Sequence, residues 1–542
     1  MFGVDVKIRQ KSVHRSACLG VVVGILFLAP QPLWAAMGEN IAISPRAMSM
    51  GNAVTADTVG TEAVHYNPAG LTKIRGKQGD THIALAKVRN FAEFNKPANY
   101  EGIFGYTEDP VIGQRSISNN HQLYVPGYGV TNAKMPVLVA PGNGWAYNDP
   151  DSRFTFATAV FLPMAVTYDR SEGDDDPARY GGRKTIMQRF TYLAPSVGYK
   201  VNDTLSLGIT GSLSHFALVT ETDFRAPNTL IAMTARLQEA LCPDGGNPID
   251  AVLFGLCNKG RLNPFTNVLN MNIEMTTSAD PTVTVGMLWE PNDWFAFGAK
   301  YSSESKMRLH GKYKITYDES VQEFFKGVSN SALGPIILAS LAMPSYVPPE
   351  EEGNVSLTLT YPKSIQMGTK MKFGKLQVNT DVGWTNWAAW DQFKMEFDQE
   401  LAAAQMARLF GFPDATTLTI PRGYQNTWST GVGLEYAFTN RFRLRGGAEY
   451  RKSSIPPDKI DTIAPLSDDI LWGLGAGITI DKYTEIDLAL SMLHTKFTAP
   501  ANTSCNLNCT DLFNMVYNPY AGLDVTAGLK IDYAAISIRK KF

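Results

Sequence analysis

The chain has 542 residues, of which 18% are charged and 11% are aromatic, and its formal net charge is −2. This balance provides no basic surface of the kind that binds nucleic acid, so nucleic-acid partners are excluded. After the N-terminal leader no apolar run approaches the roughly 20 residues of a membrane-spanning helix. Two classes remain, a large secreted β protein and an outer-membrane β-barrel.

Residues 1–36 have the features of a secretory signal peptide. A basic stretch at 7–15 precedes a short apolar core at 17–29, and small residues follow at 33–36, as in a cleavage site. The core is shorter than the roughly 20 residues that a spanning helix needs. We therefore expect an exported chain from which this leader is removed.

Residues 37–80 are rich in small residues and come before any clear strand. The pair Asn67-Pro68 predicts a turn in this stretch. Small side chains allow its backbone to lie close to a wall. We expect residues 37–80 to form a plug inside the barrel that follows, with Asn67, Pro68 and Ala69 as its motif.

Residues 81–542 repeatedly alternate apolar and polar side chains with a period of two, which predicts β-strands. In 423–438, for example, Trp428, Val432 and Leu434 share one parity, while small or polar residues occupy the other. Fourteen such segments can be drawn, an even number as a single-chain bacterial barrel requires. The segments are 81–95, 131–140, 152–168, 187–200, 204–218, 271–289, 293–317, 353–373, 375–397, 423–438, 441–452, 468–480, 483–496 and 521–541.

Alternation alone does not separate a soluble sandwich from a membrane barrel, but three other features favour the barrel. Aromatic residues lie near strand ends, as in interfacial girdles. Tiny turns alternate with long loops, the asymmetry of outer-membrane barrels. The chain also ends in a strand with a terminal aromatic residue, Phe542. The predicted fold is therefore all-β, a transmembrane antiparallel β-barrel of fourteen strands in the bacterial outer membrane.

The third segment, 152–168, contains a proline in the sequence Leu162-Pro163-Met164. Proline cannot donate a hydrogen bond to a β-ladder, so inside a strand it forces an edge, a bulge or a gap. The alternative is an ordinary proline near a strand end. We expect a gap in the barrel wall at this point.

Two long loops, 219–270 and 319–352, carry more apolar residues than outer loops should. Their spacing is compatible with helical segments, and exposed apolar patches often mark ligand sites. The two loops could also simply pack on each other. We expect a hydrophobic capture site between them, formed by Leu230, Ile231, Met233, Leu237, Phe324, Phe325, Val328, Ile336, Ile337 and Leu341.

Four cysteines lie beyond the leader, and an even number in an oxidising compartment predicts two disulfides. Pairing Cys242 with Cys257 and Cys505 with Cys509 closes the smallest loops. A metal site is the rival interpretation, but there is no nearby histidine and no C-x-x-C spacing. We expect no metal and no other cofactor.

Several segments of the chain, taken together, are typical of one known family. They are 48–53 (Met-Ser-Met-Gly-Asn-Ala), 63–71 (Ala-Val-His-Tyr-Asn-Pro-Ala-Gly-Leu), 361–368, 381–387, 443–450 and 454–458. In this order they resemble segments of the FadL family of outer-membrane transporters for long-chain fatty acids and hydrocarbons. The resemblance implies a fourteen-stranded barrel with an N-terminal hatch, capture of ligands on outer loops, and sideways exit near a kinked third strand.

The resemblance also suggests two cations for a ligand carboxylate. Arg225 and Lys394 fall near the positions of the family's basic ligand contacts, although solvated cations at the base of loops explain them equally well.

The sequence thus predicts a passive, non-enzymatic transporter, a monomer that contacts membrane lipid and lipopolysaccharide. Its cargo is a long-chain fatty acid or another apolar small molecule. The alternatives are a general diffusion porin for polar solutes and an outer-membrane hydrolase. The sequence contains no G-x-S-x-G and no H-E-x-x-H motif that would favour an enzyme.

Overall fold

The structure is a computed structural model that describes residues 43–170, 175–242, 248–410, 414–510 and 518–542. The predicted signal peptide and residues 37–42 of the predicted plug lie outside the described residues. All described residues belong to one structural unit, which spans residues 34–542. Among the described residues, no helix is both long enough and apolar enough to cross a membrane.

The strands form one antiparallel sheet that closes on itself, because the first strand pairs with the last. The register runs from Gln78 opposite Lys541 to Asn95 opposite Asp524. Several strands of the barrel are divided into two consecutive shorter strands. Counting each such pair as one strand gives the fourteen-stranded barrel that the sequence predicts. In order around the barrel they are β1 (Gly76–Asn95), β5 (Leu138–Asn148), β6 (Phe154–Asp169), β7 (Lys184–Leu193) with β8 (Ser196–Lys200), β9 (Leu205–Arg225), β10 (Asn267–Asn292), β11 (Phe295–Ser302) with β12 (Ser305–Tyr317), β13 (Glu350–Tyr361) with β14 (Ser364–Phe373), β15 (Leu376–Thr385) with β16 (Gln392–Phe397), β17 (Thr417–Pro421) with β18 (Thr427–Ala437), β19 (Phe442–Arg451), β20 (Asp469–Thr479), β21 (Thr484–Ala499) and β22 (Asp524–Lys541).

The outer face of the barrel is apolar and the inner face is small or polar. Leu434 of β18, Leu474 of β20 and Leu490 of β21 are 46%, 66% and 64% exposed. On each of these strands the residues of the opposite parity face inward, and many of them are glycines. This is the alternation of a barrel whose outer face contacts lipid. Tyr424, which the alternation places outward, is instead buried because β18 begins only at Thr427.

The second strand differs most from its predicted position, since β5 covers 138–148 and not 131–140. Its central part contains Pro141, Gly142 and Gly144, residue types that favour a turn. In the structure Gly144 faces inward, and a Cβ there would lie 2.2 Å from the Thr61 hydroxyl oxygen. A side chain at this strand position would collide with the plug, so the position requires glycine.

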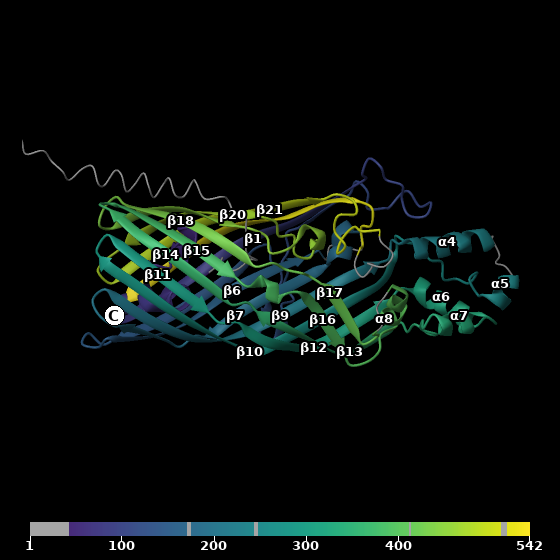
Figure 1. The fold of residues 1–542 in the computed structure, drawn as a ribbon, viewed down its shortest axis with the longest axis horizontal. Coiled ribbons are helices and arrows are strands. Elements are labelled where there is room, and N and C mark those ends of the chain that lie inside the picture. The colour runs from purple at the N-terminus through teal and green to yellow at the C-terminus, as the bar shows by residue number, and fades with distance from the viewer. Residues whose placement is uncertain (1–42, 171–174, 243–247, 411–413, 511–517) are drawn as a thin grey trace, which may run out of the picture. The chain divides into compact units, whose positions relative to one another are not determined.

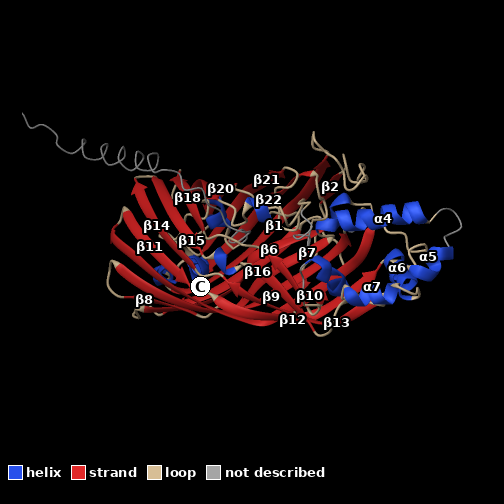
Figure 2. Cartoon of the chain, turned by 45° about the vertical axis from the view of Figure 1, so that its right-hand side comes forward, coloured by secondary structure: helices blue, strands red, loops and turns tan. Residues whose placement is uncertain are grey.

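The helices form two groups. Short helices of residues 45–73 lie against the inner face of the strands, and longer helices extend beyond one end of the barrel, opposite the end of the C-terminal strand (Figures 1 and 2). Asn228 and Asp318 cap the start of α4 and α6 with their side chains. The helices are α2 (Pro45–Ser49), α3 (Ala63–Tyr66), α4 (Thr229–Leu241), α5 (Pro248–Leu253), α6 (Glu319–Ser329), α7 (Gly334–Ser340) and α8 (Ala402–Met406); the 3-10 helices are η1 (Gly60–Glu62), η2 (Pro68–Lys73), η3 (Pro177–Gly181), η4 (Trp387–Ala389), η5 (Ala407–Phe410) and η6 (Pro457–Lys459).

Two further pieces of sheet lie in the long connection between β1 and β5. The strand β2 (Arg115–Ser118) pairs with the last part of β1. The strands β3 (Tyr124–Val125) and β4 (Gly129–Val130) form a small hairpin of their own.

Candidate functional site

A cavity of about 630 Å³ lies at the helical end of the barrel, between α4, α6, α7 and the ends of β9 and β10. It is within the size range of small-molecule sites, and such sites are mostly apolar. Of the residues predicted to form the capture site, Met233 and Ile336 do not line it and are 47% and 66% exposed. The others all line it: Leu230, Ile231, Leu237, Phe324, Phe325, Val328, Ile337 and Leu341.

The cavity also has walls that the sequence did not indicate. One is the loop around Ile103 and Phe104, and another is the α8 region, including Met406. A third contains Cys509 and Asn518 from the loop between β21 and β22. These segments lie far apart in the chain and show no periodicity that points to a shared site. A hydrophobic segment in an otherwise polar loop is the one signal that could have marked them.

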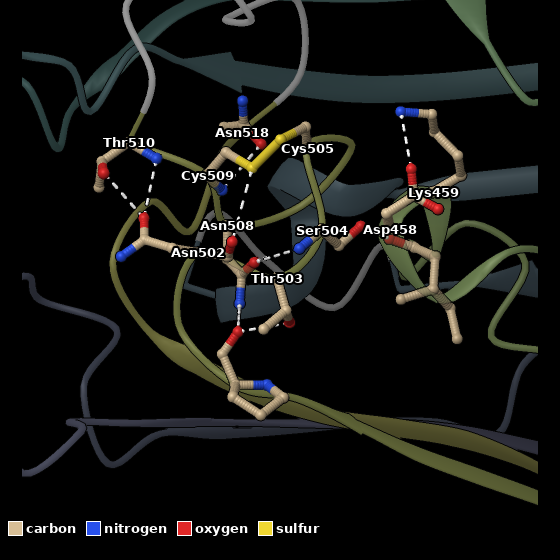
Figure 3. Close-up of a disulfide and its surroundings, with 12 residues drawn as sticks. Asp458, Lys459, Asn502, Thr503, Ser504, Cys505, Asn508, Cys509, Thr510 and Asn518 are labelled. Carbon is tan, nitrogen blue, oxygen red and sulfur yellow. Dashed lines mark hydrogen bonds and ion pairs between the residues drawn. A yellow bond between two sulfur atoms is a disulfide. The ribbon is translucent and has the colours of Figure 1, made fainter.

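Disulfides fix two of the cavity's walls. Cys242 is bonded to Cys257 beside α4, and Cys505 is bonded to Cys509 beside β21, the locally closed pairing that the sequence suggested. Figure 3 shows the second loop, in which the amide of Cys509 donates to the side chain of Asn518 (3.1 Å). Asp250 lies close to the first pair, but both sulfur atoms are used in the disulfide, so no thiolate is left for a metal.

Arg225 belongs to the cavity wall, but its guanidinium is bound by the protein itself. Its two terminal nitrogens donate to the two carboxylate oxygens of Asp109 at 2.7 and 2.9 Å, and Nε donates to the carbonyl of Pro519 at 2.6 Å. Both charged side chains are 0% exposed. Such a bidentate pair is a strong, geometrically specific interaction.

Lys394, the other predicted carboxylate ligand, lies elsewhere. It is a residue of β16, is about half exposed, and has Glu396 3.7 Å away. It is not among the residues that line the cavity. Its parity on the strand, shared with the outward-facing Gln392, explains this position.

Residues 43–75 lie inside the barrel and form hydrogen bonds to its inner wall. The side chain of Asn67 donates to the carbonyl oxygens of Thr55 (2.8 Å) and Met287 (3.0 Å), and its own oxygen accepts from the amide of Ala69 (3.1 Å). Asn67 therefore both caps η2, which Pro68 begins, and connects the plug to β10. The predicted motif has a structural role at the plug–wall contact.

Close backbone contacts explain the small residues on both sides. Gly51 has a φ of +59°, and a Cβ there would lie 2.6 Å from the backbone of Ala448. On the wall, a Cβ on Gly208 would lie 2.2 Å from Pro68, and one on Gly473 would lie 2.1 Å from Met48. Glycine is required because plug and wall approach within backbone contact.

Buried charges add to this contact. Arg46 forms ion pairs with Asp57 and with Glu62, both inside the plug. Asp57 also lies 3.4 Å from Lys370 of β14. Burial opposes the charged carboxylate, but Arg46 and Lys370 together hold the pKa of Asp57 below its ordinary value. The charge of Asp57 thus joins plug to barrel.

The barrel wall is interrupted between β5 and β6. Their pairing covers only Asn143–Asn148 with Thr155–Val160 and then stops. Pro163 follows directly, at a register shift between Phe161 and Met164 in the pairing with β7. Leu162 is half-buried, and Pro163 and Met164 are buried. The facing strand contains a second proline, Pro141, just beyond the last pair.

The side chain of His121 connects β6 to β1 beyond the interruption. The ring nitrogens of His121 lie 2.9 Å from the carbonyl oxygen of Thr167 on β6 and 3.0 Å from that of Val88 on β1. A small inner cavity touches Val88 together with Ala165 and Val166.

A second short pairing, between β13 and β16, has a different structure. It covers only Val355–Leu357 with Met395–Phe397. Trp387 and Trp390 lie beside it, are both 0% exposed, and pack edge to face at 5.0 Å. The indole nitrogen of Trp390 donates to the carbonyl of Thr360 (2.8 Å). Two large buried side chains therefore occupy the position beside this second short pairing.

A closed barrel with an apolar outer face and an occupied bore defines an outer-membrane β-barrel protein. The chain matches, over residues 27–542, a family model described as outer membrane protein transport protein (OMPP1/FadL/TodX), and it belongs to this family. It is thus an outer-membrane transport protein of the FadL/TodX type, a family that transports hydrophobic compounds. No curated protein matches the chain.

Solved structures share the fold at low sequence identity. A Pseudomonas aeruginosa FadL homologue is 19% identical, with a TM-score of 0.63, 94% of this chain covered and 99% of that chain. The Pseudomonas putida toluene transporter TodX is 14% identical, with a TM-score of 0.57 and coverage of 94% and 99%. The Ralstonia pickettii toluene transporter TbuX is 16% identical, with a TM-score of 0.54 and coverage of 92% and 98%.

Proposed function

We propose that this protein takes up hydrophobic compounds passively, capturing them in the cavity of the outer loops and releasing them sideways through the interruption between β5 and β6. The observation that carries the proposal is the combination of an apolar cavity at one end, a bore filled by residues 43–75, and a wall whose pairing stops at Val160.

Sideways release has a clear energetic reason. Each methylene exposed to water costs about 0.8 kcal/mol, so a chain of about fifteen methylenes would cost roughly 12 kcal/mol if released into water. Exit through the wall delivers the cargo to the apolar interior of the membrane and avoids release into water. The two prolines make such an exit possible because neither Pro141 nor Pro163 can donate a hydrogen bond to close the ladder.

A general diffusion porin is the main alternative. It would need a water-filled bore and polar outer loops, whereas the plug here is bonded to several strands and the outer cavity is lined mostly by apolar side chains. Both features favour transport of apolar cargo.

The test replaces the two prolines with valine, which has the backbone N–H donor that proline lacks. In the variant Pro141→Val/Pro163→Val we expect the β5–β6 pairing to lengthen and uptake of a labelled apolar compound by cells to fall several-fold, with binding to the purified protein unchanged. Pro281→Val is the matched control, because Pro281 lies near a register shift of β10 on another side of the barrel.

Hydrogen exchange of the β5 and β6 amides shows whether the ladder has lengthened. Uptake at the wild-type rate in a double variant with protected amides would contradict release at this position. Equal losses in the double variant and in Pro281→Val would mean that prolines in the wall act through folding alone.

A further inference from the structure

The cavity of the outer loops contains almost no charge. Among its described lining residues, Arg225 is the only one with an ionisable side chain that is charged at neutral pH. The rest are mainly leucine, isoleucine, valine, phenylalanine and methionine, with a few threonine and asparagine residues. A ligand in this cavity meets hydrocarbon on nearly every side.

The single cation is already neutralised. All three nitrogens of Arg225 donate to protein oxygens, and both oxygens of Asp109 are engaged by it. A carboxylate from a ligand would have to displace Asp109, whose own charge would then remain buried without a partner. Losing one partner of a buried ion pair is strongly unfavourable, so Arg225 supports the loops and does not receive a ligand.

Two arginines near the lining residues, Arg236 and Arg408, are paired as well. Arg236 of α4 is bonded to Glu239 (2.7 Å) and to the carbonyl of Gly105 (2.6 Å). Arg408 lies 3.6 Å from Glu400. The internal segments outside the described residues contain no lysine, arginine or histidine; these segments are 171–174, 243–247, 411–413 and 511–517.

We infer that this cavity selects uncharged apolar cargo, such as a hydrocarbon or an acyl ester, over the carboxylate of a free fatty acid. The inference rests on the proposed function and specifies its cargo. Its physical basis is desolvation: a carboxylate that enters an apolar cavity loses its hydration, and the one cation among the described lining residues, Arg225, is already paired with Asp109. An ester or a hydrocarbon loses no comparable hydration.

The experiment compares two ligands with the same chain, hexadecanoate and methyl hexadecanoate, on the purified full-length protein at a pH well above the carboxyl pKa. Binding is measured by displacement of a neutral fluorescent alkyl probe. We expect the ester to bind at least about tenfold more tightly, a difference of 1.4 kcal/mol. Equal or tighter binding of the carboxylate would overturn the inference and leave the proposed function intact. Failure of the probe and both ligands to bind would overturn the proposed function and the inference with it.

Because the two ligands also partition differently into detergent, a pair of variants provides the internal comparison. Thr234→Arg places a cation on a lining position of α4, and Met233→Arg places the same cation one residue earlier, on an exposed position that does not line the cavity. We expect Thr234→Arg to shift the ratio of the two affinities about tenfold towards the carboxylate, and Met233→Arg to leave it unchanged. An unchanged ratio in Thr234→Arg, or equal shifts in both variants, would overturn the inference.

Discussion

At the scale of single residues, the protein uses buried charges to hold its parts together. Arg225 and Asp109 connect the end of β9 to a loop 116 residues earlier in the chain. Asp57 connects the plug to β14 through Lys370. In each case the opposite charge offsets the cost of burial, and the residues are structural even though their types would suit a ligand site.

Because Asp57 is charged in the folded protein, we expect the packing of residues 45–73 inside the barrel to weaken in acid. Its carboxyl pKa is lower in the folded protein than the ordinary value of about 3.9, so its stabilising effect is present above that value and is lost as the pH falls through the folded-state pKa. We expect the amides of residues 45–73 to lose hydrogen-exchange protection in acid.

The variant Asp57→Asn is the control for this effect. It should weaken protection at neutral pH and make protection less dependent on acid, because the titrating group is gone. If hydrogen-exchange protection in Asp57→Asn falls in acid as it does in the wild type, carboxylates other than Asp57 cause the loss.

Single residues were partly predictable from sequence. Pro163 stood out because proline is rare inside a strand, and the cysteine pairing followed from loop size. Pro141 did not stand out, because it lies in a glycine-rich stretch that resembles a turn. The partner of Arg225 could not be found, because Asp109 lies in a loop whose position depends on the folded barrel. The sequence therefore suggested a ligand contact at Arg225, and the structure places its guanidinium in an ion pair with Asp109.

At the scale of elements, α4 shows how one helix forms both the cavity wall and an exposed face. Leu237 lines the cavity, while Met233, one turn earlier, does not, although their exposures are nearly equal at 46% and 47%. Substitutions at Leu237 and Met233 can therefore be compared to distinguish a change in the cavity from a change in the stability of α4.

We expect Leu237→Asp to weaken binding of a neutral alkyl ligand by about tenfold, because it puts a charge against the ligand. Met233→Asp should leave binding within a factor of about two, equivalent to less than 1 kcal/mol. Titration of the purified variants with the same fluorescent alkyl probe measures both. Comparable losses in the two variants would place the binding site away from α4.

The elements themselves were largely predictable. The period-two alternation gives fourteen strands because each has one face towards lipid and one towards the lumen. The second strand was displaced in the prediction because glycines that face the plug lack the side chains that make alternation visible. The breaks within strands, such as that between β15 and β16 around Trp387, depend on contacts with distant residues and leave no clear local pattern.

At the scale of the whole molecule, the barrel is closed by pairing of its first and last strands, and pairing is short at two places, between β5 and β6 and between β13 and β16. The bore is occupied by residues 43–75, which are bonded to several strands. The wall is continuous where strands pair fully and interrupted beside Pro163. Under the proposed function, cargo from the outer cavity leaves through this interruption and does not pass residues 43–75.

Removal of the plug should make the barrel permeable to small solutes. We expect a variant lacking residues 38–75 to make liposomes permeable to small sugars, since the space that the plug occupies becomes water-filled. Liposome swelling in sugar solutions measures this directly, with the full-length mature chain as the control. If the deleted variant folds into a closed barrel but swells no faster than the full-length protein, the plug is not what seals the bore.

The route of the cargo is the central claim, and photo-crosslinking in outer membranes tests it most directly. An alkane that carries a diazirine group should label the cavity residues on α4 and α6 and also the edges of the interruption at 138–142 and 161–166. Labelling of the cavity followed by label along the plug and the opposite end of the bore, with none on β5 or β6, would contradict sideways release.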